Sequence, residues 1–293
     1  FIKGRKQRVK LDQDTKSQWE TVPAGVPQGT KLGPWLFILM IDDIGRNNTD
    51  NIWKYVDDTT IAEHVPKAKT SYIQKSVDQL LHESEENNFQ INEDKCKELR
   101  ISFAKRVPDL RPVIINDKPI EVVPSVKLLG LNISNDLKWN CHISDISRKF
   151  STRLYFIKQL KRAHVDTKDI LSFYTTCIRP IAEYASPVFH NSLTKYLSEE
   201  LERLQKRAMK IIFPGRDYND ALSFAGLSTL YERRQVQTIK LFKDITINKE
   251  HKLHRFLPNL NNSRHNLRKK RIFDVPHFKT NRLKNNFFYS NCQ

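Results

Sequence analysis

Cysteine is scarce in this sequence of 293 residues, and no two cysteines have the CxxC spacing. The four are Cys96, Cys141, Cys177 and Cys292. So few cysteines in a chain of this length argue against a disulfide framework. Zinc ligation by Cys177 with His164 and His190 would fit no standard zinc spacing. We therefore expect a reduced, intracellular compartment, nuclear or cytoplasmic.

Long apolar runs are also missing. The longest, residues 35–41, is far shorter than the roughly 20 residues that a membrane-spanning helix needs. No basic, apolar and small-residue pattern of a signal peptide is visible. The first residue is Phe1 rather than Met, which leads us to expect that the sequence starts inside a longer protein. We expect no membrane partner.

Acidic residues are few beside basic ones: 33 Asp and Glu stand against 50 Lys and Arg, a formal net charge of +17. A body this positive repels itself unless it meets a polyanion, and nucleic acid is the commonest polyanion. Solubility alone is the alternative explanation, although added acidic residues serve solubility at least as well. Hydrophobic residues make up 39% and aromatic residues 10%, which argues against a wholly disordered chain.

Residues 1–135 have the pattern of an α+β unit with antiparallel hairpins. A first hairpin is expected in residues 1–24, and the apolar run 35–41 predicts a buried helix that Pro34 can open. Asp57-Asp58 is the expected turn between two short strands, and Thr70 can cap the helix that follows. Those two strands are 52–56 and 59–63, and further strands are expected at 99–103, 113–115, 120–123 and 126–133, the last with Gly130 at its centre.

Residues 136–250 are expected to be helical, and residues 251–293 to form a basic, weakly ordered tail. The periodicity predicts helices near 143–160, 166–179, 201–212 and 230–247, the second ending before Pro180. One face of the first helix is basic, with no acid between Asp145 and Asp166. Its basic residues are Arg148, Lys149, Arg153, Lys158, Lys161 and Arg162. An ordinary solvated face is the alternative, but the single sign of charge favours contact with phosphates.

The adjacent carboxylates of Asp57 and Asp58 are the first sign of chemistry. Like charges so close raise each other's pKa unless a cation lies beside them. Mg²⁺, which is hard and prefers oxygen ligands, would remove that repulsion. The alternative is that Asp57-Asp58 only makes a turn, since Asp favours turns.

The order of several motifs resembles the palm of reverse transcriptases, especially those of jockey-like and LINE-like non-LTR retrotransposons. Val26-Pro27-Gln28-Gly29 resembles motif B, and Tyr55-Val56-Asp57-Asp58 resembles motif C, the metal-binding hairpin. Asn92 to Lys95 resembles motif D, and Leu129-Gly130 resembles motif E, the primer grip. Motifs B and C in this order are specific, whereas D and E alone are weak. The resemblance continues through the helices, so it implies a partial palm in residues 1–135 and a thumb-like or connection region in 136–250.

The resemblance implies an RNA-directed DNA polymerase that adds deoxynucleoside triphosphates to a DNA primer on an RNA template. Two metal ions, Mg²⁺ or Mn²⁺, would flank the transferred phosphorus. Asp57 would bind metal, with Asp58 in support. Pro27, Gln28, Gly29 and Tyr55 would lie against template and nucleotide.

Two further assignments come from the same resemblance. Lys95 would donate a proton to pyrophosphate, although a solvated lysine fits it nearly as well. Leu129 and Gly130 would hold the primer, although a β-bulge would also explain Gly130.

The pattern is incomplete because motif A, which supplies a further carboxylate at the end of an apolar strand, is not recognisable. Asp12 and Asp14 lie in a polar turn instead. We therefore expect that this chain alone does not polymerise. The alternative function is that of a non-catalytic, basic nucleic-acid-binding remnant. The oligomeric state is left open.

Overall fold

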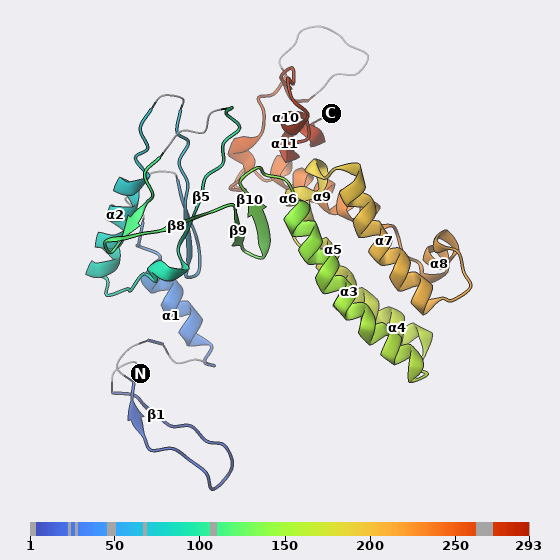
Figure 1. Cartoon of the computed structure of the whole chain (residues 1–293), viewed down its shortest axis with the longest axis horizontal. Helices are drawn as coiled ribbons and strands as arrows, with labels where there is room; N and C mark the ends of the chain where they lie inside the picture. Colours follow the sequence, from blue (N-terminus) through green and yellow to red (C-terminus); the bar gives the residue numbers. More distant parts are fainter. Residues whose placement is uncertain are drawn as a thin grey trace. The chain divides into compact units, whose positions relative to one another are not determined.

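The computed structural model describes residues 4–22, 25–26, 29–45, 51–66, 69–105, 110–261 and 272–292. They fall into two compact units (Figure 1). The first unit comprises Phe1–Glu98 and Lys105–Val123, and the second comprises Leu99–Ala104 and Pro124–Gln293. Helix and short antiparallel strand pairs are mixed, as expected for an α+β chain.

The first unit is built from short hairpins and two helices. Its elements are β1 (Lys6–Gln7), β2 (Glu20–Thr21), α1 (Leu32–Ile41), β3 (Ile52–Tyr55), β4 (Asp58–Ile61), α2 (Ile73–Glu86), β5 (Lys97–Leu99), β6 (Ile114–Ile115), β7 (Lys118–Pro119) and β8 (Glu121–Val123). The expected first hairpin is confirmed, since β1 pairs with β2 and the Asp12 carboxylate accepts the N–H groups of Asp14 and Thr15 at its turn. β6 and β7 form a hairpin around Asn116 and Asp117, while the strand expected at 120–123 appears as β8, which pairs with β5.

A small core holds this unit together. It contains Val77 from α2 with Val113 and Ile115 from the β6 region. Thr70 does not cap α2, contrary to expectation. Instead, the Glu63 carboxylate accepts the N–H groups of Tyr72 and Ile73, because a negative charge is favourable at the positive end of a helix.

The prediction of a buried helix at residues 35–41 is wrong in one respect. Helix α1 forms, but Gly33 is its only fully buried residue. Trp35 and Leu39 are 67% and 68% exposed. An apolar run therefore predicted the helix correctly but not its burial, because burial depends on what packs against the helix.

The second unit is a hairpin followed by helices around a large core. Its elements are β9 (Ser125–Leu128), β10 (Leu131–Ser134), α3 (Asn140–Arg162), α4 (Thr167–Phe173), α5 (Arg179–Glu183), α6 (Ser186–Phe189), α7 (Lys195–Ile212), α8 (Tyr218–Ala225), α9 (Leu230–Ile247), α10 (Asn281–Lys284) and α11 (Phe287–Asn291). Phe150, Ile157, Ile178 and Leu201 are fully buried members of its core. The apolar stripe of α3 is thus confirmed.

The helix expected to end before Pro180 does not end there. A π-helical segment, Tyr174–Ile178, connects α4 to α5, and Pro180 occupies the first turn of α5. Proline is tolerated there because the first helical N–H groups need no partner within the helix. The α3 and α7 helices lie side by side within this unit (Figure 1).

The expected weakly ordered tail is partly described. Residues 262–271 lie outside the described residues. Residues 272–292 include α10 and α11. Phe273 and Cys292 are buried in a small cluster with Phe242 of α9. The sequence did not predict this small apolar cluster.

Candidate functional site

The two carboxylates resembling motif C lie on the β3–β4 hairpin. Tyr55 pairs with Asp58, so the turn consists of Val56 and Asp57. The expected turn at Asp57-Asp58 is therefore displaced by one residue, and Asp58 is the first residue of β4. Val56 has a φ of 58°, which is unusual for a β-branched residue and marks local backbone strain. Such strain is common at functional sites and turns.

Tyr55, Asp57 and Asp58 are brought together in this hairpin, and all three are exposed. Within the described ranges, no cluster of three or more His, Cys, Asp or Glu could hold a metal ion. The carboxylate of Asp12 is engaged in its own turn, where the N–H groups of Thr15 and then Asp14 lower its pKa. The hairpin thus offers the two carboxylates of Asp57 and Asp58, which would be part of a donor set for a magnesium ion.

Lys54 fastens the hairpin to helix α1. Its Nζ donates hydrogen bonds to the carbonyl oxygens of Ile41 (3.0 Å), Asp42 (2.7 Å) and Ile44. These carbonyls lie at the C-terminal end of α1, where a cation satisfies unpaired acceptors and the helix dipole. The strand that leads to Asp57 and the helix that follows motif B are therefore joined by one side chain.

Motif B is only partly described. Pro27 and Gln28 lie outside the described residues. Gly29 has a φ of 77°, and a Cβ placed on it would meet nothing within 4 Å. Its backbone conformation thus favours glycine, while the space beside it is open.

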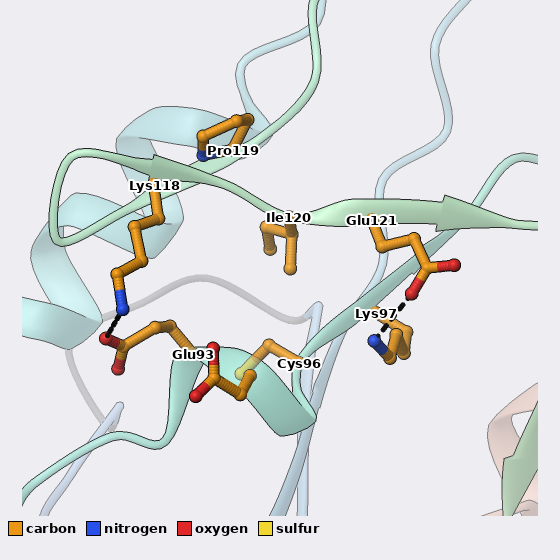
Figure 2. Close-up of a pocket in the computed structure, with 8 residues that line it drawn as sticks. Glu93, Cys96, Lys97, Lys118, Pro119, Ile120 and Glu121 are labelled. Carbon is orange, nitrogen blue, oxygen red and sulfur yellow. Dashed lines mark hydrogen bonds and ion pairs between the residues drawn. The ribbon is translucent and has the colours of Figure 1, made fainter.

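Motif D forms a short 3₁₀ turn, Glu93–Lys95, in which the Asn92 side chain accepts the N–H of Lys95. Lys95 is exposed. A cavity of about 160 Å³ lies beside this turn and is shown in Figure 2. The Lys118–Glu93 and Lys97–Glu121 ion pairs cross it, at 2.9 and 2.7 Å. Its two lysines are thus paired with glutamates, and neither Lys95 nor Asp57 lines it.

The Leu129-Gly130 pair forms a tight turn in the second unit. The single strand expected over residues 126–133 is instead a hairpin, because β9 and β10 pair with Leu128 opposite Leu131. Leu129 and Gly130 have φ values of 45° and 85°, as a two-residue turn of this hand requires. Gly130 is therefore a turn residue rather than a β-bulge.

Tyr184 supports this turn, and sequence reasoning did not single it out. Its hydroxyl donates to the Leu129 carbonyl at 2.8 Å. A Cβ on Gly130 would come within 3.1 Å of the Tyr184 ring. The neighbouring Glu183 carboxylate binds Arg233, and Arg179 lies 3.6 Å away. The sequence signal was its place in the helical region over which the resemblance to reverse transcriptases continues.

The six basic residues of α3 divide into two groups. Arg148 pairs with Asp145 at 2.9 Å, Arg153 donates to the Cys177 carbonyl at 2.6 Å, and Lys161 donates to the Ile212 carbonyl at 3.2 Å. Arg153 and Lys161 thus complete backbone hydrogen bonding at the π-helical segment and at the end of α7. Lys149, Lys158 and Arg162 are exposed. No described residue forms an ion pair or hydrogen bond with these three side chains.

Aromatic residues add to this helix a feature that sequence reasoning missed. Tyr155 and Phe156 are 58% and 49% exposed, and their ring centroids lie 5.9 Å apart in a T-shaped pair. Neither ring belongs to the core, although each lies on a helix with a large buried face. The sequence did contain a signal for this pair, because Tyr155 and Phe156 are aromatic residues that lie outside the buried apolar stripe of α3.

The candidate residues are divided between the two units. Gly29, Tyr55, Asp57, Asp58 and Lys95 belong to the first unit. Leu129, Gly130 and the basic residues of α3 belong to the second. In the described part of the chain, no helix is both long and apolar enough to cross a membrane.

Comparison with known proteins supports a polymerase origin. Residues 5–133 match the family model for reverse transcriptase (RNA-dependent DNA polymerase). Residues 139–179 match a second family model, the N-terminal region of alkylated DNA repair protein alkB homolog 8. No solved structure matches the chain significantly.

Curated relatives extend the similarity beyond the first unit. The chain is 26% identical to the RNA-directed DNA polymerase from mobile element jockey of Drosophila melanogaster, over 72% of this chain and 24% of that protein. It is 25% identical to the Drosophila funebris jockey polymerase and 21% identical to the probable RNA-directed DNA polymerase from transposon X-element of Drosophila melanogaster, with the same coverage. The chain thus spans about a quarter of the length of these relatives. Residues 5–133 thus resemble reverse transcriptases, and the chain is similar over 72% of its length to RNA-directed DNA polymerases of the jockey and X-element mobile elements.

Proposed function

We propose that this chain is the part of a retrotransposon RNA-directed DNA polymerase that carries the metal-binding hairpin and the nucleic-acid-binding helices. The observation that carries the proposal is the β3–β4 turn, which holds Asp57 at its tip and Asp58 directly after it. A bound Mg²⁺ or Mn²⁺ ion would supply charge neutralisation for the triphosphate and activation of the primer 3′-hydroxyl. The partners would be an RNA template, a DNA primer and deoxynucleoside triphosphates.

The residues of the chain would act around that ion by position and charge. Asp57 would ligate the metal, and Lys54 would keep the hairpin in place against α1. Gln28, Gly29 and Tyr55 would lie against template and nucleotide, and Lys95 would donate the proton to pyrophosphate. In the second unit, the Leu129-Gly130 turn would contact the primer.

We further propose that the chain does not extend a primer by itself. The resemblance implies a further metal-binding carboxylate from motif A, which is not recognisable in the sequence, so Asp57 and Asp58 would form only part of the ligand set. The exposed basic residues Lys149, Lys158 and Arg162 of α3 favour a second candidate function, that of a non-catalytic nucleic-acid-binding remnant. In that case the hairpin would have no role, and the basic helices would carry the function.

Manganese binding followed by NMR separates these candidates. Mn²⁺ titrated into labelled protein should broaden the amide signals of residues 55–59, because the paramagnetic ion would lie at the turn. Asp57→Asn should abolish the broadening. Asp117→Asn is the matched control, since Asp117 is an exposed carboxylate in another two-residue turn of the same unit. Equal broadening at both turns, or none at Asp57, would remove the support for a metal site.

Primer extension tests the expected inactivity. With a primed RNA template, deoxynucleotides and Mg²⁺, the chain should incorporate no detectable nucleotide. Incorporation that Asp57→Ala abolishes would contradict the proposed inactivity while supporting the polymerase site.

A further inference from the structure

Helix α7 carries a basic stripe that the proposed polymerase site does not use. Arg203, Arg207 and Lys210 recur at intervals of four and three residues, so they share one side of the helix. All three are exposed. No acidic residue occurs between Glu202 and Asp217, so this side of α7 is positive without interruption.

The contacts between α3 and α7 bring this stripe next to basic residues of α3. Tyr196 donates to Asn140, Ser147 to Glu200 at 2.7 Å, and Lys161 to the Ile212 carbonyl. These contacts advance in the same direction along both helices, so α3 and α7 run parallel. Between them, Arg207 donates to the Ser151 hydroxyl at 3.4 Å.

Ser151 therefore marks the edge of α3 that borders the α7 stripe. Tyr155, Lys158 and Arg162 follow Ser151 at four, seven and eleven residues, which places them on the same edge. We call the surface formed by Tyr155, Lys158, Arg162, Arg203, Arg207 and Lys210 the α3–α7 basic face. Arg148 is left out because Asp145 already neutralises it.

The aromatic rings decide what kind of strand this face suits. Tyr155 lies within the face, and the exposed ring of Phe156 lies beside it. Exposed rings among basic residues bind single strands, because unpaired bases stack on the rings while phosphates meet the cations. Bases inside a duplex are already stacked on one another and cannot use such rings.

We propose that the α3–α7 basic face binds a single-stranded segment of RNA or DNA. This inference rests on the proposed function only for its class of partner, nucleic acid. It adds the place of binding, which spans two helices, and the state of the strand, which is unpaired. It does not need the Asp57 hairpin.

The test is fluorescence anisotropy of the full chain with labelled 20-nucleotide RNA and DNA single strands and a duplex of equal length. The charge variant is Arg203→Gln/Arg207→Gln/Lys210→Gln. Single-strand affinity should fall tenfold or more at low salt. The slope of log K against log salt should decrease by about 2, since each single-strand phosphate contact contributes about 0.7. The matched control is Lys240→Gln/Lys243→Gln/Lys249→Gln, which removes three exposed charges near and after the end of α9 and should change affinity less than about threefold.

Stacking is tested separately with Tyr155→Ala and Phe156→Ala. Each should weaken single-strand binding by about fivefold or more without changing the salt slope, and should leave duplex binding unaltered. Tyr72→Ala, which removes a ring that is 69% exposed in the first unit, should have no effect. Thermal melting should be unchanged in all these variants, because the altered side chains are exposed.

Several results would overturn the inference. One is a preference for the duplex, and another is an equal loss in the charge variant and its control. A third concerns other polyanions, namely anionic vesicles or polyglutamate. If the chain binds them as tightly as it binds the oligonucleotide, and the charge variant loses that binding too, the face is a general polyanion surface. Comparing RNA with DNA identifies the strand. The two proposals can also fail separately. If Asp57→Asn still binds the single strand and Mn²⁺ has no effect at the hairpin, the polymerase proposal is contradicted and the single-strand proposal is not.

Discussion

Gly130 and Gly215 have nearly the same backbone, with φ values of 85° and 87°, but different surroundings. Gly130 lies against the Tyr184 ring, whereas a Cβ on Gly215 would meet nothing within 4 Å. The two glycines thus separate the cost of a left-handed backbone from the cost of a steric contact. That separation matters because Gly130 belongs to the turn proposed to contact the primer.

We predict that Gly130→Ala lowers the free energy of unfolding more than Gly215→Ala does. Gly215→Ala should cost about 1 kcal/mol from backbone strain alone. Gly130→Ala should cost about 2 kcal/mol, because the ring of Tyr184 must also move. Urea unfolding followed by circular dichroism measures both. Equal losses in the two variants would mean that the Tyr184 ring gives way freely and does not brace the turn.

A fully buried amide joins four elements of the second unit. Gln205 of α7 accepts a hydrogen bond from the Tyr174 hydroxyl at 2.6 Å and donates to the Tyr218 hydroxyl and to the Ser228 carbonyl, at 3.0 and 3.1 Å. The partners come from the π-helical segment, from α8 and from the segment before α9. A buried network of this kind is stable only while each polar group keeps its partner.

Replacing Gln205 with leucine should therefore destabilise the unit more than its change in volume suggests. We expect Gln205→Leu to cost about 2–4 kcal/mol, because the buried Tyr174 hydroxyl and two partly buried groups lose a partner at once, and Tyr174→Phe to cost about 1–2 kcal/mol. Gln235→Leu, at an exposed position of α9, is the control and should be nearly neutral. Chemical denaturation of the three variants gives the comparison. A Gln205→Leu loss no larger than that of Gln235→Leu would refute the role of the network.

The success of sequence reasoning varied from element to element for physical reasons. The α3, α7 and α9 helices were predictable because each repeats apolar residues at helical spacing over several turns. The β9–β10 hairpin was mistaken for one strand because a turn made by Leu129 and Gly130 looks like two more residues of an apolar run. Likewise, Asp57 could be singled out from its motif, but Tyr184 could not. Its role depends on a contact with Leu129, far away in sequence, that only the folded chain creates.

For the whole molecule, the pH dependence of stability should be set partly by a buried histidine. His190 is 8% exposed, with its ring 5.2 Å from that of Tyr231. Burial, with the charge of Arg234 as the second cause, lowers the pKa of His190 to about 4. Burial also lowers the pKa of His142. In the unfolded chain both would titrate near about 6.5.

Because the folded pKa of His190 lies below the unfolded value, the unfolded chain binds more protons between these two pKa values. Stability should therefore be complete above about pH 6.5 and decrease as the pH falls toward about 4, by about 2–3 kcal/mol from His190. His190→Gln should flatten this decrease, whereas His277→Gln, at an exposed position, should not. Urea unfolding at pH 7.5 and pH 4.5 provides the measurement. An unchanged pH dependence in His190→Gln would show that other groups govern it.

The parallel packing of α3 and α7 also has a kinetic consequence. Two helices joined by a short loop pack antiparallel, and their contacts form early because the closed loop is small. Here the chain must pass from the end of α3 through α4, α5 and α6 before α7 can start beside Asn140. The contacts that assemble the basic face are thus distant in sequence, and such contacts slow folding. On a ribosome, α3 would emerge and wait for α7, so the surface proposed to bind a single strand would be completed only after the intervening helices had been synthesised.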